Sequence, residues 1–247
     1  MRAKGAQFGF SLIELSVAIA ILALLTWAVS GAYGNGMRQG ERDVAAAQGE
    51  NVRDVIRSFA LRNRRLPCPD ASGSGWEGDA HGVCAAGAEI GWVPYRSLGM
   101  DIPASPLRAA YGVYRNAGIN ADLAVTAERT GSVPGSASYQ DIRDLIVGLA
   151  IANTQAPAAS HLYLTGNDGV QGVVDCNNNK VAVPAFVVVL PLQDRNGDGS
   201  LFDGVQTGLP GNIICFQSEN TPPAAIRDDV VIAEGLHTLV GWLSAHT

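Results

Sequence analysis

The sequence is poor in charged residues and in cysteine, and it has almost no lysine. Charged residues make up 16% of its 247 positions, and most of the 17 cationic side chains are arginine. The net charge is −6 and the pI about 5.1, so the chain lacks the basic surface that binding to nucleic acid phosphates needs. Apolar residues reach 47%, which excludes a chain that is disordered throughout.

The sequence also lacks the short motifs of common enzyme classes. It contains no G-x-S-x-G serine motif, no H-E-x-x-H zinc motif, no Walker A loop, and no G-x-G-x-x-G after a predicted strand. We therefore expect no enzymatic activity.

A short basic start and a long apolar run dominate the N-terminal part of the chain. Arg2 and Lys4 precede a run from Phe10 to Ser30, in which Glu14 is the one ionisable side chain. A helix of that length measures about 30 Å, the hydrocarbon thickness of a bilayer. Basic residues before the run and none close after it place the N-terminus in the cytoplasm. We therefore expect a single-pass inner-membrane precursor whose remaining chain lies in the periplasm.

A secretory signal peptide and a plain membrane anchor are the simpler alternatives. The apolar run is longer than the roughly 7–15 residues of a signal peptide, and Ala28-Val29-Ser30 is a loose match to its cleavage site. A plain anchor leaves Glu14 unexplained, because a carboxylate in a span costs a few kcal/mol, about 3 on insertion scales.

The segment Gly9-Phe10-Ser11-Leu12-Ile13-Glu14-Leu15 resembles the processing site of type IV prepilins and type II secretion pseudopilins. The resemblance implies a leader of residues 1–9, which prepilin peptidase removes between Gly9 and Phe10, and N-methylation of Phe10. Glu14 becomes the fifth residue of the mature chain. Its carboxylate would pair with the N-terminal ammonium group of a neighbouring subunit, since a buried charge needs a partner.

An amphipathic helix is predicted beyond Gly40. Apolar residues recur there at helical spacing, at Val52, Val55, Ile56 and Phe59. Pro67 ends the pattern, because the residue before proline avoids the helical region. A helix from Phe10 to about Arg65 would be about 80 Å long.

This helix divides into a span and filament core at 10–36 and an amphipathic half at 37–66. The glycine-rich stretch 31–36 either loosens the helix or lets neighbouring helices approach closely. Both alternatives stay open.

Residues 67–247 are predicted to form a globular α+β head. Short β-branched runs predict strands at 90–95, 111–115, 181–192, 213–217 and 230–233, a helix at 139–151, and a helix or strand at 236–243. One long helix followed by mixed strands is typical of an α+β fold. The resemblance to pilins implies that the helix packs on an antiparallel sheet.

Three head segments extend the resemblance to a subgroup of large pilin-like proteins. They are LPCPD at 66–70, GWVPYRSLG at 91–99 and RDDVV at 227–231.

All four cysteines follow the apolar run, in a compartment where disulfides persist. Of three possible connectivities we favour Cys68–Cys84 and Cys176–Cys215, because each pair stays within one section of the head. Zinc is the less favoured alternative, since the histidines are scattered and no C-x-x-C spacing occurs.

Residues 194–203 begin like a calcium-binding loop. The candidate ligands are Asp194, Asn196, Asp198 and Asp203. The match fails at its twelfth position, which is Val205 instead of glutamate, so Asp203 would have to substitute. The alternative is an acidic, glycine-rich turn without metal.

Together these features predict a structural subunit, minor or specialised, of a type IV pilus or a type II secretion pseudopilus. Its expected partners are other pilin or pseudopilin subunits, prepilin peptidase and the inner membrane, with no nucleic acid. The alternative is a membrane-anchored extracytoplasmic binding domain or enzyme that does not form filaments.

Overall fold

The structure is a computed structural model that describes residues 12–79, 82–84, 87–116, 118, 120–131, 140–166, 173–211, 213–224 and 226–247. By contacts the chain divides into two units, Met1–Asp43 and Val44–Thr247. The second half of the long helix therefore groups with the head.

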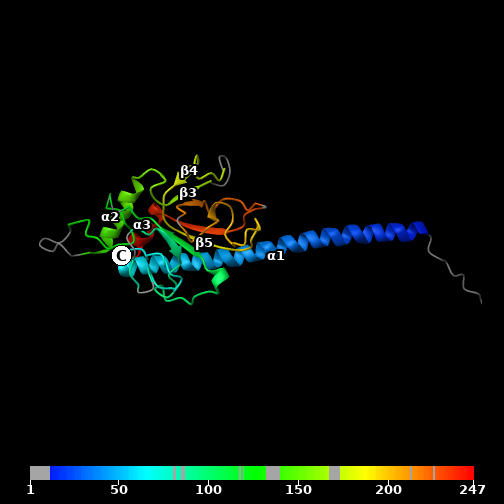
Figure 1. The fold of residues 1–247 in the computed structure, drawn as a ribbon, viewed down its shortest axis with the longest axis horizontal. Coiled ribbons are helices and arrows are strands. Elements are labelled where there is room, and N and C mark those ends of the chain that lie inside the picture. The colour runs from blue at the N-terminus through cyan, green and yellow to red at the C-terminus, as the bar shows by residue number, and fades with distance from the viewer. Residues whose placement is uncertain are drawn as a thin grey trace, which may run out of the picture. The chain divides into compact units, whose positions relative to one another are not determined.

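Helix α1, Leu12–Asn63, is a single element of 52 residues, drawn from blue to cyan in Figure 1. The glycine-rich stretch 31–36 does not interrupt it, so the backbone shows none of the loosening considered above. The helix ends shortly before Leu66-Pro67, where Arg64 adopts a left-handed conformation with φ 60°.

In the first unit, the apolar side chains of α1 are exposed. Exposed fractions lie between 52% and 86% for Leu12, Ile13, Leu15, Val17, Ile19, Ile21, Leu22, Leu24, Leu25, Trp27 and Val29. Among the helices in the described part of the chain, none combines the length and the apolarity of a membrane-crossing segment.

In the second unit, α1 supplies one side of the main core. Its buried residues are Ala45, Val52, Ile56, Phe59 and Ala60, so the predicted apolar stripe is the buried face. Gly49 lies on the same face: a Cβ there would come within 2.6 Å of Ile232 Cγ1. The helix backbone thus lies so close to the sheet that any larger residue at this position would force a neighbouring side chain to shift.

A four-stranded antiparallel sheet forms the centre of the head. Its order is β1 (Ile90–Trp92), β2 (Ala110–Val113), β5 (Pro184–Leu190), β7 (Val230–Gly235). All residues of β5 are buried. Phe186 and Val188 belong to the main core with α1, whereas Val187 and Val189 belong to a second core with Phe216. The alternation along the strand explains how one sheet serves two cores.

A three-stranded sheet adjoins the second core. Its order is β4 (Lys180–Ala182), β3 (Tyr163–Thr165), β6 (Cys215–Gln217). Strand β3 runs antiparallel to β4 but parallel to β6. The larger sheet is antiparallel, as expected, whereas the smaller sheet is mixed.

Two short helices complete the main core. Helix α2, Ile142–Asn153, begins at a capping box, in which the Asp141 side chain accepts from the Arg143 N–H and the Asp144 side chain accepts from the Asp141 N–H. Helix α3, Leu236–Ala245, follows β7 directly and buries Leu239 and Leu243. Single 3-10 turns occur at Ser105–Leu107 and Gly204–Gln206.

Candidate functional site

The N-terminal processing site lies at the edge of the described residues. Gly9 and Phe10, where cleavage and methylation are predicted, are outside them. Glu14 lies in the first turn of α1 and is exposed, beside the exposed side chains of Ile13 and Leu15. A carboxylate in a first turn interacts favourably with the positive end of the helix dipole.

Most of the exposed large apolar side chains in the described part of the chain lie on α1. Its large side chains, from Leu12 to Val29, are all more than half exposed. Contiguous apolar surface of this kind marks an interaction site, because it costs free energy in contact with water. The arrangement therefore suits contact with other apolar helices or with lipid.

A buried ion pair connects the second half of α1 to the head. Glu234 on β7 is 1% exposed, and its oxygens accept hydrogen bonds from Nε and Nη2 of Arg57, each at 3.1 Å. Burial raises the pKa of Glu234, and the charges of Arg57 and Arg53 oppose the shift. The Arg57 guanidinium also lies 5.9 Å from the ring centroid of Trp242 on α3. One arginine therefore links helix, edge strand and C-terminal helix.

This ion pair could have been predicted from one residue of the sequence, although not from apolar periodicity. Glu234 is the one charged residue of Val230–Gly235, a strand that is otherwise apolar and largely buried. A charged side chain inside such a strand needs a partner of opposite charge, and the arginine-rich face of α1 could be expected to supply it.

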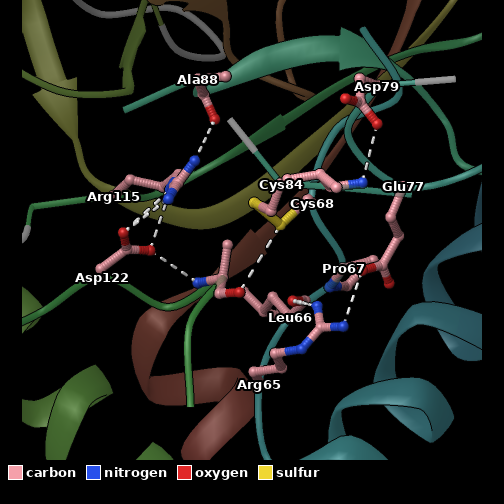
Figure 2. The surroundings of a disulfide bond; sticks show 12 residues. Arg65, Leu66, Pro67, Cys68, Glu77, Asp79, Cys84, Ala88, Arg115 and Asp122 are labelled. Carbon is pink, nitrogen blue, oxygen red and sulfur yellow. Dashed lines mark hydrogen bonds and ion pairs between the residues drawn. A yellow bond between two sulfur atoms is a disulfide. The ribbon is translucent and has the colours of Figure 1, made fainter. Parts of the chain in front are cut away.

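Immediately after α1, the disulfide Cys68–Cys84 fixes the start of the head, as Figure 2 shows. Arg65 Nη2 lies 2.8 Å from Glu77 Oε2, which ties the segment after the helix to the loop that the disulfide closes. Nearby, Arg115 Nη2 donates to Asp122 Oδ2 at 2.8 Å, and Nη1 donates to the Ala88 carbonyl at 2.9 Å.

The carboxyl group of Glu89 interacts electrostatically with Arg115 and Asp122, and its pKa is far from the ordinary value. Burial raises its pKa to about 7, against the opposing effects of the Leu162 backbone N–H and the Arg115 charge. The Asp122 charge adds to the increase in pKa. Glu89 is therefore partly protonated near neutral pH.

A second disulfide, Cys176–Cys215, joins the start of β6 to the loop after β3. The Tyr163 hydroxyl donates to the Cys176 carbonyl at 2.7 Å, so the loop is also held from the strand. Both pairings are those favoured from the sequence. Because no cysteine is free, the zinc alternative that needed thiolates is wrong.

The loop with the predicted calcium ligands is held by its own hydrogen bonds. Asp194 accepts from the backbone N–H groups of Gly197, Asp198 and Gly199, at 2.6, 3.2 and 2.9 Å. Asn196 Nδ2 donates to Asp198 Oδ2 at 2.9 Å. Both oxygens of Asp194 are thus engaged by the loop itself.

The fourth predicted ligand, Asp203, lies in a different group. Its carboxylate oxygen comes within 4.8 Å of those of Asp228 and Asp229, and all three residues are buried. Burial raises the pKa of Asp203, while the N–H groups of Arg195 and Asn196 lower it. The Arg195 guanidinium also donates to Asp228 at 2.5 Å.

Within the described residues, this three-aspartate group is the set whose spacing could hold a metal ion. The sequence had marked residues 227–231 as a resemblance without linking Asp228 or Asp229 to Asp203. Calcium binding by the loop stays a prediction.

Comparison with known proteins bears on the N-terminus. Residues 4–30 match the family model of the prokaryotic N-terminal methylation motif. Neither the curated proteins nor the solved structures include one that matches the chain. The matched range includes Gly9, Phe10, Glu14 and the exposed apolar side chains of α1 from Leu12 to Val29. The chain therefore carries the N-terminal methylation motif that is the signature of type IV pilins and pseudopilins.

Proposed function

We propose that the chain is a structural subunit of a type IV pilus or a type II secretion pseudopilus, assembled through the first half of α1. The observation that carries the proposal is the methylation motif directly followed by a helix with exposed apolar side chains from Leu12 to Val29. Packing such helices against each other removes that surface from water, at about 25 cal/mol per Å² buried.

In this proposal the precursor is anchored in the inner membrane with its head in the periplasm. Prepilin peptidase removes residues 1–9 and methylates Phe10, and the mature chain moves from lipid into the filament. Glu14 then pairs with the N-terminal ammonium group of an adjacent subunit. The pair sets the register between subunits, because the carboxylate lies one helical turn from its own N-terminus.

The head is the part that would distinguish this subunit. It contributes two disulfides and two sheets but none of the catalytic motifs sought in the sequence. We propose a mechanical, adhesive or assembly-initiating role without substrate turnover. Its size favours a minor or specialised subunit.

Processing and assembly are tested separately. Full-length chain in membranes is incubated with prepilin peptidase and a methyl donor, S-adenosylmethionine, and the N-terminus is sequenced. The proposal expects loss of residues 1–9 and a methylated Phe10. A chain that still begins at Met1 would be a plain anchor and would overturn the proposal.

Assembly is tested with charge variants on α1. Glu14→Ala and Glu14→Gln should leave cleavage intact but reduce recovery in sheared filaments or pseudopili by about tenfold, since the ammonium group of the neighbour loses its counter-charge. Glu41→Ala removes a carboxylate farther along the same helix and serves as the matched control. Equal recovery of the Glu14 and Glu41 variants would contradict the role given to Glu14.

A further inference from the structure

The acidic loop holds an asparagine followed by glycine in an exposed position. Asn196 and Gly197 are both exposed, and Gly197 adopts φ 74° with open space where a Cβ would lie. An Asn-Gly peptide bond is chemically the most susceptible of the asparaginyl bonds, because the glycine nitrogen can reach the asparagine side chain without steric hindrance. The surroundings of this pair are therefore relevant to its reactivity.

The nitrogen that would attack is already in contact with a base. The Gly197 N–H donates to Asp194 Oδ1 at 2.6 Å. A carboxylate at hydrogen-bond distance from the proton to be removed is correctly placed for general-base catalysis.

The carbonyl that would be attacked is held by a hydrogen-bond donor. Asn196 Oδ1 accepts from the Asp198 backbone N–H at 3.0 Å. A donor in that position stabilises negative charge as it develops on the oxygen. Asn196 Nδ2, the leaving group, donates to Asp198 Oδ2 at 2.9 Å and to Thr207 Oγ1 at 3.4 Å, which fixes the orientation of the amide.

We propose that Asn196 is a site of self-modification, which converts to aspartate and isoaspartate through a succinimide, with Asp194 as the catalytic base. The Gly197 nitrogen forms a bond to Asn196 Cγ as Asp194 takes its proton. The Cγ–Nδ2 bond then breaks, and the nitrogen leaves as ammonia after protonation by solvent, which reaches this exposed loop. Water adds to either carbonyl of the ring, and the ring opens to aspartate or isoaspartate. No oxidant, reductant or cofactor is required.

The chain contains its own comparison site. Asn35-Gly36 is the same dipeptide, but it lies within α1. A helical backbone engages the glycine N–H in an intrahelical hydrogen bond. The two sites therefore differ in conformation and not in sequence.

The experiment follows both dipeptides in one sample. Full-length chain is incubated at pH 7.5 and 37 °C, either native or in concentrated guanidinium chloride, and peptides are assayed by mass spectrometry and by an isoaspartate-specific assay. In the native chain, residue 196 should gain one mass unit about tenfold faster than in the denatured chain. This acceleration is smaller than the rate gain that a well-positioned general base usually gives. Residue 35 should react more slowly in the native chain than in the denatured one.

Variants separate catalysis from simple exposure. Asp194→Asn should lower the native rate at 196 to the denatured rate or below. Asp175→Asn is the matched control, because Asp175 also accepts backbone N–H groups in a turn, those of Asn177 and Asn178, and it should leave the rate at 196 unchanged. Asp194→Glu, which keeps a carboxylate, should retain part of the acceleration.

Three results would overturn the proposal. The first is a native rate at 196 equal to or below the denatured rate, which would mean that the hydrogen bonds protect Asn196. The second is an unchanged native rate in Asp194→Asn. The third is a mass gain without isoaspartate, which would indicate direct hydrolysis instead of a succinimide.

Discussion

The close approach of α1 to the central sheet at Gly49 gives a sharp test of how the helix packs on the head. In Gly49→Ala the new Cβ would lie 2.6 Å from Ile232 Cγ1 and 2.8 Å from Leu190 Cδ1. Both neighbours belong to the main core and are only 6% exposed. Overpacking of this kind costs about 1–3 kcal/mol, and alanine returns about 1 kcal/mol of helix propensity. We expect a net loss of up to about 2 kcal/mol.

The assay is denaturant and thermal unfolding of the full-length chain with its disulfides intact, and it follows the transition of the second unit, Val44–Thr247. For a unit of this size, Tm should fall by about 2–4 °C for each kcal/mol lost. Gly241→Ala is the matched control: Gly241 is exposed on α3, and nothing lies within 4 Å of its Cβ position. That variant should gain about 1 kcal/mol. If Gly49→Ala proves as stable as Gly241→Ala, the close packing inferred here is wrong.

Two further predictions concern pH and covalent structure. Glu89 has a pKa of about 7 in the folded chain, so the folded state retains a proton that the unfolded state releases from its ordinary pKa near 4.5 upward. Stability should therefore fall as pH rises between about 4.5 and 7. Glu89→Gln should reduce that slope, and it should gain about 1–2 kcal/mol above pH 7, after allowance for solvent screening. An unchanged slope in titrated unfolding curves would refute the assignment. Removing the disulfide Cys176–Cys215 by double serine substitution should cost about 4 kcal/mol, and removing Cys68–Cys84 about 3, since the sequence separations are 39 and 16. If the denaturant midpoint falls further on removal of Cys68–Cys84 than on removal of Cys176–Cys215, the chain-entropy account is contradicted.

Features encoded by local patterns were predictable from the sequence. The apolar spacing of Val52, Ile56 and Phe59 predicted the face of α1 that is buried. The helix at 142–153 was predicted at 139–151 from its periodicity, whereas 236–243 was left open as a helix or a strand and forms α3. Four of the five predicted strand regions overlap one strand each. Both disulfides followed from a simple preference for partners close in sequence.

Features that depend on tertiary pairing were not predictable. The run 181–192 was expected as one strand, but it forms β4 and β5, which belong to different sheets and separate at Val183. Proline at 184 lacks the N–H that a continuous ladder would need. Strand β3, Tyr163–Thr165, is too short to show alternation, and its parallel partner β6 is separated from it in the chain by β4, β5 and the acidic loop.

The candidate site also has one part that was predictable from the sequence and one part that was not. The processing segment has a local motif and was predictable. Asp203 was grouped with Asp194 because they are close in the chain, yet the fold places it against Asp228 and Asp229, which follow β6 and precede β7. Asp203 therefore contacts residues distant in the sequence, which a local pattern cannot reveal.

The disulfide between Cys176 and Cys215 encloses β4, β5 and the whole acidic loop. A single protease cut in that exposed loop would leave two fragments that stay covalently joined, with β5 on one and β6 on the other. Such a nicked head would migrate as one band without reductant and as two with it. After such a cut the chain would lose backbone continuity in the loop but keep its C-terminal strand and helix attached.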